Sequence, residues 1–370
     1  MKNRPMRTIK VPLKLNPYLI YFVKSPWSPL RTLLIKYGLT SQAIILTHPP
    51  LNRFYGVDLI KVLKKTVSKV ILLELPEGEK TKSWDRAGWV FHKLLRNKID
   101  KGGVVIILGG GVLGDLGGFV AATYRRGVPF INIPTTLLAQ IDSSVGGKVG
   151  IDHPLGKNMI GAFYHPRFII NSPLFLKTLA TREIRSGLAE IIKYAIIADE
   201  RLFTFLENNI EGLLRLRPQV LEKAIARCCE IKAAIVAADE KEKSGLRTIL
   251  NFGHTLGHAL ETVSHYKGIT HGEGIAVGMT FAVKLSEKLG LCRGEVVSRV
   301  CQLLQRAGLP LQVSVQKYPF MKVFEAMQMD KKTYNGQFRL VLTRNIGHVI
   351  VCSNPPNDLV QLMLKECFFP

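Results

Sequence analysis

Residues 104–118 read VVIILGGGVLGDLGG, and this stretch determines how the first half of the chain folds. Five apolar residues run into GGGVLG at residues 109–114, which fits the pattern G-x-G-x-x-G between a strand and a helix. Such glycines let backbone N–H groups approach a pyrophosphate, and the N-terminus of the helix favours its negative charge. The motif therefore predicts a dinucleotide site, although a merely tight turn fits the same residues.

The glycine turn departs from a standard dinucleotide-binding unit, because it follows the third plausible strand and its acidic residue lies upstream. Glu79 and Lys82 come after the preceding strand, where a carboxylate can accept a hydrogen bond from a ribose hydroxyl. Thr135 and Thr136 come after the following strand, so their hydroxyls are further candidates for contact with the cofactor.

Apolar strands alternate with helical patterns through the first half of the chain, and long helical patterns dominate the second half. The alternation predicts an α/β domain over residues 1–177 with a mainly parallel, doubly wound (Rossmann-like) sheet. A mainly α-helical domain is expected over residues 178–370, with the active site in the interdomain cleft. The expected strands are 43–46, 69–75, 104–108, 130–133, 338–343 and 348–352, and the expected helices are 84–97, 181–198, 201–216, 219–242, 246–262, 271–289 and 294–307.

The formal net charge of +23 admits nucleic acid, a lipid surface or an anionic small molecule as a partner. The basic residues are scattered and not interleaved with aromatic residues, which favours a solvated surface and argues against nucleic acid. We expect no membrane helix, because no run of ~18 apolar residues occurs. The six cysteines include no CxxC pair and no secretory signal is recognised, which favours a cytoplasmic protein.

Residues 246–261, LRTILNFGHTLGHALE, have the pattern of a single helix with an unusual polar face. Arg247, Asn251, His254 and His258 recur at steps of four, three and four residues, which share one face at ~100° per residue. A polar row of this kind costs desolvation unless a metal, an anion or a substrate meets it. We therefore predict that this face lines a site.

A metal set is suggested by Glu190, His254 and His271, with Lys193 one helical turn from Glu190. Two imidazoles and one carboxylate form a catalytic zinc set with an open position. The spacing also allows His258 as a ligand in place of His271, because HxxxH pairs on one helix face bind zinc. Each of these residues alone also fits a solvated face or a satisfied core position.

A glycine-rich polar loop is expected at residues 142–157, DSSVGGKVGIDHPLGK, followed by Asn158. It carries Asp142, Lys148 and Lys157 among glycines that permit close approach of the backbone to a ligand, and lysines suit phosphate. The alternative is a flexible surface loop with solvated lysines.

Together these stretches resemble the 3-dehydroquinate synthase family of the sugar-phosphate cyclase superfamily, over roughly residues 40–350. The motifs that carry the resemblance are GGGVLGDLGGFVAATYRRG (109–127), IPTTLLAQIDSSVGGKVGID (133–152), PLGKNMIGAF (154–163), GLAEIIKYA (187–195), LNFGHTLGHALE (250–261) and HGEG (271–274). The last motif is a departure, since the family more usually has HGEA.

The resemblance implies an enzyme that uses NAD and one divalent metal, Zn²⁺ or Co²⁺, and acts as a homodimer. The implied reaction converts 3-deoxy-D-arabino-heptulosonate 7-phosphate to 3-dehydroquinate and phosphate. It proceeds by transient oxidation with NAD, phosphate elimination, re-reduction, ring opening and aldol cyclisation. Alternatives are a sister cyclase of the inosose or valiolone type and an NAD-dependent polyol-phosphate dehydrogenase. Arg247 and Lys193 suit a substrate with a carboxylate. Such a pair favours 3-dehydroquinate synthase over the inosose cyclases, whose substrate has no carboxylate.

The resemblance also implies roles for individual residues. Glu190, His254 and His271 would hold the metal. His258 would transfer protons or contact phosphate, Arg126 would reach the neighbouring subunit's site, and Asp142 would contact substrate and cofactor. The substrate carboxylate would meet Arg247, Lys193 and Lys232, and its phosphate end would meet Lys148, Asn158, Asn251 and Lys331. The NAD-contacting positions would be Gly110, Gly111, Val112, Asp115, Thr135, Thr136, Asp142, Lys148, Lys157, Phe175 and Thr178, with Glu79 and Lys82 at the adenosine ribose.

Overall fold

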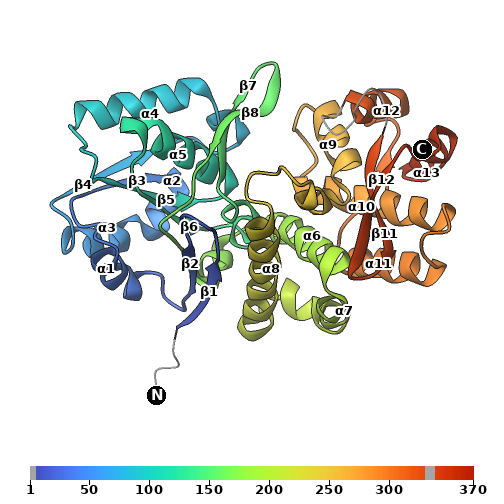
Figure 1. Cartoon of the computed structure of the whole chain (residues 1–370), viewed down its shortest axis with the longest axis horizontal. Coiled ribbons are helices and arrows are strands. Elements are labelled where there is room, and N and C mark those ends of the chain that lie inside the picture. The colour runs from blue at the N-terminus through green and yellow to red at the C-terminus, as the bar shows by residue number, and fades with distance from the viewer. Residues whose placement is uncertain (1–5, 330–337) are drawn as a thin grey trace. The chain divides into compact units, whose positions relative to one another are not determined.

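The computed structural model describes residues 6–329 and 338–370, and the chain divides into two compact units (Figure 1). Unit 1 comprises Met1–Thr178 and Lys232–Lys241, and unit 2 comprises Leu179–Ile231 and Glu242–Pro370. The short segment Lys232–Lys241 therefore groups with the first unit, although it lies within the second half of the chain. The domain ranges expected from the sequence stay predictions.

Unit 1 is built on a seven-stranded sheet with the order β1-β2-β9-β6-β5-β3-β4. Only the β1–β2 pair is antiparallel, so the expected doubly wound, mainly parallel sheet is confirmed. The short strands β1, β2 and β9 were not expected from the sequence. The strands are β1 Arg7–Val11, β2 Tyr18–Phe22, β3 Gln42–Thr47, β4 Lys69–Glu74, β5 Val104–Gly109, β6 Phe130–Pro134 and β9 Phe168–Asn171.

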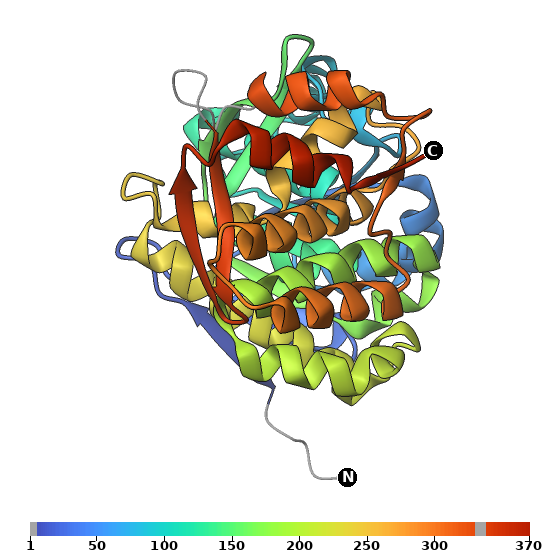
Figure 2. The ribbon, with the colours of Figure 1, turned by 90° about the vertical axis from the view of Figure 1, so that its right-hand side faces the viewer.

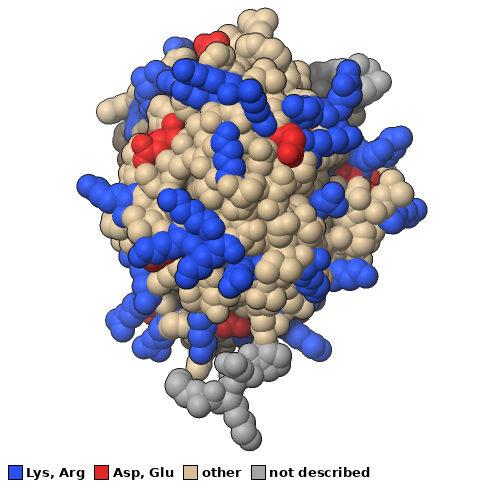
Figure 3. Space-filling view, turned by 90° about the vertical axis from the view of Figure 1, so that its left-hand side faces the viewer, with Lys and Arg blue, Asp and Glu red and all other residues tan. Residues whose placement is uncertain are grey.

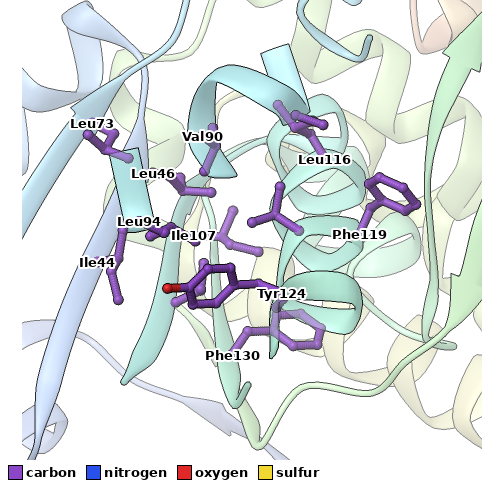
Figure 4. Close-up of a cluster of buried hydrophobic side chains, with 14 of the residues drawn as sticks. Ile44, Leu46, Leu73, Val90, Leu94, Ile107, Leu116, Phe119, Tyr124 and Phe130 are labelled. Atoms are coloured by element: carbon purple, nitrogen blue, oxygen red, sulfur yellow. The ribbon is translucent and has the colours of Figure 1, made fainter. Parts of the chain in front are cut away.

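The central strands are apolar at every position because both faces of the sheet are covered. Alternate residues point to opposite faces: Ile44 and Ile107 join the core under α4 (Trp84–Arg96) and α5 (Gly111–Thr123), drawn in Figure 4. The residues next to Ile44 and Ile107 in the sequence point to the opposite face of the sheet. There they form a second hydrophobic core with α1 and α3. The remaining helices of unit 1 are α1 Trp27–Lys36, α2 Pro49–Leu51, η1 Asn52–Gly56, α3 Val57–Lys64, η2 Glu79–Thr81, η3 Tyr124–Arg126, η4 Ala139–Ser143 and η5 Pro173–Thr178.

The prediction of a polar loop at residues 142–157 is wrong for most of that segment. Residues Lys148–His153 and Gly156–Phe163 form an antiparallel hairpin of strands β7 and β8. The hairpin lies close to α5, and a Cβ on Gly118 would overlap the side chain of Val149. Packing against α5 thus gives this glycine-rich segment a regular structure that local sequence does not favour.

Unit 2 is mainly helical, as expected. Figure 2 shows its helices together with the β11–β12 hairpin, which lies against α10 and α6. The predicted strands 338–343 and 348–352 are confirmed as β11 and β12. The elements are α6 Thr181–Ala198, α7 Glu200–Leu214, α8 Pro218–Ala238, η6 Leu246–Asn251, α9 His254–Val263, α10 His271–Lys288, α11 Gly294–Arg306, β10 Val313–Ser314, α12 Phe320–Met329, β11 Arg339–Asn345, β12 His348–Ser353, α13 Asn357–Lys365 and β13 Phe368–Phe369.

The single helix expected over residues 246–262 is wrong. A 3₁₀ helix, η6, ends at Asn251, and α9 begins at His254 after a break at Phe252 and Gly253. Phe252 has non-helical backbone angles (φ −55°, ψ 124°), and Gly253 has φ 78°, a conformation that costs glycine little. Arg247 and Asn251 therefore do not share a continuous helix face with His254 and His258.

The break at Gly253 allows a close contact between α9 and α10. A Cβ on Gly253 would lie 2.9 Å from the carbonyl oxygen of Ile275, and a Cβ on Gly257 would lie 3.1 Å from the carbonyl carbon of Gly274. A Cβ on Gly278 would overlap the carbonyl oxygen of Gly253. We call these four glycines (253, 257, 274 and 278) the glycine contact. In the HGEG motif, a Cβ on Gly274 would lie 3.2 Å from the carbonyl oxygen of Gly257, which is a tight contact.

Basic side chains are spread over the face of the molecule that Figure 3 shows, with few acidic side chains between them. They are not gathered into one groove there, although their summed field would attract anions at low ionic strength. Among the helices that the structure describes, none is both long and apolar enough to cross a membrane.

The glycine contact leads to a stability prediction. Gly278→Ala should lower the free energy of unfolding by roughly 1–3 kcal/mol, because the new methyl group overlaps backbone that has little room to move. Gly88→Ala is the matched control, since Gly88 lies exposed within α4 and a Cβ there has no neighbour within 4 Å. This change should raise stability by up to about 1 kcal/mol. Urea unfolding of both variants checks the pair, and equal effects would contradict the role of the contact.

Candidate functional site

Three side chains of unit 2 form a compact cluster of ligand atoms. His254 Nε2 lies 3.6 Å and His271 Nε2 lies 3.5 Å from the same oxygen of Glu190, Oε1. The ligand atoms of the three residues all lie within 4.8 Å of one another. Tertiary structure therefore brings together a carboxylate from α6 and two imidazoles that begin α9 and α10.

The hydrogen bonds of the two histidines use Nδ1 of each ring and leave Nε2 available to a metal. His254 Nδ1 lies 3.1 Å from the carbonyl oxygen of Phe252, and His271 Nδ1 lies 3.2 Å from Oε1 of Glu261. In the neutral ring each acceptor favours the tautomer with hydrogen on Nδ1, so that the lone pair on Nε2 faces Glu190 once the ring is deprotonated. Two neutral imidazoles and a buried carboxylate fit a divalent ion such as Zn²⁺ or Co²⁺.

The buried cluster also holds charge of both signs. The Nζ atom of Lys193 pairs with Glu190 Oε2, one turn along α6, and both side chains are almost fully buried. Burial lowers the pKa of His271, but contacts with Glu190 and Glu261 outweigh it and raise that pKa to about 10. Binding of a metal by His271 would therefore release a proton.

The other predicted residues of unit 2 lie on neighbouring segments. His258 lies one turn into α9, with its ring centroid 5.2 Å from that of His254 and 6.2 Å from that of His271. Arg247 is buried on η6, and its Nε atom lies 3.2 Å from Glu242 Oε1. Asn251 ends η6. Lys331 lies outside the described residues.

Contacts at the N-terminus of α10 hold the backbone of its first residue, His271, in place. Thr270 caps the helix in a reciprocal capping box with Glu273, and Arg182 binds both oxygens of Glu273 at 2.8 and 2.6 Å. The amide of Gly272 donates to Ser186 Oγ at 2.9 Å, and a Cβ on Gly272 would overlap the backbone of Ser186. Helix α10 is thereby held against α6, four residues before Glu190.

The glycine turn in unit 1 has the structure expected for a dinucleotide site. Strand β5 ends at Gly109, Gly110 is the N-cap of α5, and Gly111 begins the helix. A Cβ on Gly110 would lie 3.0 Å from Thr136, and one on Gly111 would lie 2.9 Å from Ser143 Oγ. Val112 follows in the first turn of α5, and Thr135 is buried beside Gly109, to whose carbonyl oxygen it donates at 3.0 Å. The open N-terminus of α5 favours an anion.

A network of charges lies beside this turn. The buried ammonium of Lys82 binds Asp115 Oδ2 at 2.5 Å and also Asn158 Oδ1. Lys157 Nζ binds Glu79 Oε1 at 2.9 Å. Burial raises the pKa of Asp115, and Lys82 only partly offsets this effect. Five residues predicted for the cofactor or the substrate are thus brought together, although they come from three separate segments of the chain.

Two residues that were predicted separately, Asp142 and Lys232, pair with each other. Lys232 Nζ donates to the backbone oxygen and to Oδ1 of Asp142, both at 2.7 Å. Lys148 begins β7 with its side chain exposed. Arg126 is also exposed, and it has φ 61° in a turn with Arg125 at φ 47°.

Phe175 and Thr178 occupy the end of unit 1, in η5. The Phe175 ring is buried against Tyr55 and Trp27, at centroid distances of 5.0 and 5.9 Å. Thr178 Oγ1 lies 3.0 Å from the hydroxyl of Tyr55. The structure thus gives the Phe175 side chain a place in the core.

Two acidic residues beside these clusters were missed in the sequence. Glu261 contacts His271, and its position seven residues after His254 was a usable signal, because such residues share a helix face. Asp152 Oδ1 accepts from the amide of Asn158 at 2.8 Å, and burial raises the Asp152 pKa. Nothing in the local sequence indicates this contact, which depends on the β7–β8 turn.

Comparison with known proteins places the chain in a family. Residues 72–186 match the family model for the N-terminal part of 3-dehydroquinate synthase, and residues 187–333 match the model for its C-terminal part. The chain belongs to the 3-dehydroquinate synthase family. Relatives with that name include a protein of Nitrosococcus oceani, 45% identical over 98% of this chain and 99% of the relative. A protein of Pseudomonas entomophila is 44% identical over 97% of both chains.

Solved structures support the same fold. The 2-deoxy-scyllo-inosose synthase complexed with carbaglucose-6-phosphate, NAD⁺ and Co²⁺ has a TM-score of 0.88 at 23% identity, over 98% of this chain and 100% of that one. A 2-epi-5-epi-valiolone synthase from Streptomyces hygroscopicus subsp. jinggangensis, with NAD⁺ and Zn²⁺ bound, has a TM-score of 0.85 at 25% identity, over 94% and 96%. At 23% identity, the similarity to the 2-deoxy-scyllo-inosose synthase concerns the fold alone.

The charge network beside the glycine turn leads to a pH-dependent prediction. Lys82→Met should lower the free energy of unfolding by about 2 kcal/mol near pH 7, because it leaves the Asp115 carboxylate without its ammonium partner. The pKa of Asp115, already raised, would rise further, so the loss should grow as pH increases and shrink as the carboxyl protonates. Urea unfolding between pH 4.5 and 7.5 measures this trend.

The double variant Lys82→Met with Asp115→Asn is the control for that experiment. It removes the charge that the single variant leaves buried, so most of the lost stability at pH 7 should return. An equal loss at both ends of the pH range, or no recovery in the double variant, would contradict the assigned pairing.

Proposed function

We propose that this protein is a 3-dehydroquinate synthase that converts 3-deoxy-D-arabino-heptulosonate 7-phosphate to 3-dehydroquinate and phosphate, with NAD and one divalent metal. The observation that carries the proposal is the Glu190, His254 and His271 cluster, in a chain that shares 45% identity with a 3-dehydroquinate synthase over nearly its whole length. Two solved cyclases of the same fold, bound to NAD⁺ with Co²⁺ or Zn²⁺, support both cofactors.

Each cofactor has a defined task in this proposal. An ion held by Glu190, His254 and His271 would act as a Lewis acid toward the substrate hydroxyl that is oxidised. NAD would supply reversible hydride transfer to and from the substrate, with no net change in its own oxidation state. The backbone amides at Gly110 and Gly111 would meet its pyrophosphate, with Thr135, Thr136 and the Lys82 network nearby.

The protein's own side chains bind and orient the substrate. Arg247 and Lys193, with Lys232, would bind the C1 carboxylate, since a guanidinium can make two charge-assisted bonds to it. Asp142 would bridge substrate and cofactor. The phosphate end would meet Lys148, Asn158, Asn251 and Lys331.

Proton transfer would fall to His258. Oxidation of a hydroxyl releases a proton, and elimination of phosphate moves a proton from the adjacent carbon to the leaving phosphate; an imidazole suits such transfers near neutral pH. The ring centroid of His258 lies 5.2 Å from that of His254 and 6.2 Å from that of His271, which supports a proton-transfer role beside the proposed metal site.

The charge of the chain bears on its substrate. The substrate is a small phosphorylated sugar acid, whose negative charge suits a chain with a net charge of +23. We further propose a cytoplasmic homodimer in which the exposed Arg126 reaches the neighbouring subunit's site. Sedimentation measurements test this oligomeric state.

The reaction itself is tested by incubation with the heptulosonate phosphate, zinc and NAD at a tenth of the enzyme concentration. Because NADH is consumed within each cycle, we expect many equivalents of phosphate and dehydroquinate with no build-up of NADH absorbance. Chelation should abolish turnover, and zinc or cobalt should restore it. NADH that accumulates with product would indicate a dehydrogenase, and turnover only with sugar phosphates that lack a carboxylate would indicate a sister cyclase.

Arg247 provides a second test. Arg247→Gln should reduce kcat/KM for the heptulosonate phosphate by roughly 10²-fold, because the buried site loses a charged partner for the substrate carboxylate. Arg306→Gln is the control, since Arg306 forms an exposed ion pair with Glu211 and should leave kcat/KM unchanged. An Arg247 variant with normal kcat/KM would remove this residue from the substrate site.

A further inference from the structure

The position of His271 is determined by several contacts, but only some of them touch its ring. The capping box of Thr270 and Glu273, and the bond from Gly272 to Ser186, hold the helix backbone. The imidazole itself lies between two carboxylates. Its Nε2 atom lies 3.5 Å from Glu190 Oε1, and its Nδ1 atom lies 3.2 Å from Glu261 Oε1.

Glu261 belongs to the buried face of α9. Its side chain is about 10% exposed, and α9 packs against α10 through the glycine contact. The same helix therefore carries both His254, at its first position, and the carboxylate that contacts the other proposed metal ligand. A carboxylate this deeply buried costs desolvation unless it accepts hydrogen bonds, and the Nδ1–H of His271 is one available donor.

We propose that Glu261 is a positioning residue for the metal site, which rests on the proposed function of that site. Its carboxylate accepts the Nδ1–H of His271, holds the ring plane and keeps the Nε2 lone pair toward Glu190. Metal-bound histidines commonly donate their second nitrogen to such an acceptor, which also makes the ligand more basic.

The two proposed histidine ligands then differ in their acceptors. His254 donates to the neutral carbonyl of Phe252, whereas His271 donates to the charged Glu261. His271 is therefore the stronger donor of the two, and removal of Glu261 weakens only one bond to the metal. Such a change alters the ligand field without dismantling the site.

A competing assignment uses the same residues. His258, Glu261 and His271 also bring ligand atoms within 4.8 Å of one another, which would suit a second ion. In that arrangement Nδ1 of His271 would itself be a ligand, and the chain would bind two metal ions. The positioning role predicts one ion per chain, so stoichiometry separates the two assignments.

The experiment compares Glu261→Gln and Glu261→Ala with the wild type. Metal affinity is measured by competition with a chelator for Zn²⁺ and Co²⁺, without substrate or NAD. We expect Glu261→Ala to lower the affinity roughly 10- to 100-fold. Glu261→Gln should have a smaller effect, because an amide oxygen still accepts the Nδ1–H. The visible absorption of bound Co²⁺ should shift in both variants, with one ion bound per chain.

Glu207→Gln is the matched control. Glu207 lies on α7 and is bound by Arg299 at 2.9 and 2.7 Å, and none of its described contacts is with the imidazole. This variant should lower the Tm while it leaves metal affinity within about threefold and the Co²⁺ spectrum unchanged. If the role of Glu261 were purely structural, its variants would also lower the Tm without changing the metal affinity or the Co²⁺ spectrum.

The outcomes separate this inference from the proposed function. If the wild type binds one ion and turns over substrate, but Glu261→Ala binds the ion equally tightly with the same Co²⁺ spectrum, only the positioning role is overturned. Two ions per wild-type chain would overturn it in favour of the second site. If the wild type binds no ion, or Glu190→Gln binds as tightly as the wild type, the proposed metal site fails together with the inference.

Discussion

The close contact between α9 and α10 is the constraint on which the proposed metal centre depends. His254 and His271 are the first residues of these two helices, so the distance between the helices determines the distance between the imidazoles. Backbone meets backbone at Gly253, Gly257 and Gly278, where any side chain would overlap the facing helix. A wider spacing would carry at least one imidazole away from Glu190.

Unit 1 uses the same physical device for a different purpose. Glycines in the turn before α5 let the threonine and serine of neighbouring loops approach, and Gly117 and Gly118 let α5 lie close to β5 and β7. In both units the missing side chain lets the backbone approach a neighbouring element closely, and a ligand is proposed beside each place. The stability cost of glycine in a helix is accepted at these positions because close packing requires it.

Several of the lysines proposed for substrate and cofactor are paired with acidic partners, although the chain has a large excess of basic residues. Lys82 pairs with Asp115, Lys193 with Glu190 and Lys232 with Asp142. These side chains are therefore oriented before an anion arrives, whereas the basic residues on the exposed face of Figure 3 are spread out. Orientation in advance lowers the entropy lost on binding, which a diffuse positive field does not do.

Local sequence was sufficient for the central strands and most helices, and together with the family resemblance it singled out the cluster of Glu190, His254 and His271. Apolar strands with helices between them have few ways to bury both faces, so the parallel sheet followed from β3, β5 and β6. The break at Gly253 and the β7–β8 hairpin did not follow, because each exists through contacts with a distant helix. The same is true of Glu261: its spacing from His254 was visible, but its role appears only when α10 brings His271 beside it. Periodicity reports one element at a time, and a metal centre made from three helices depends on their packing.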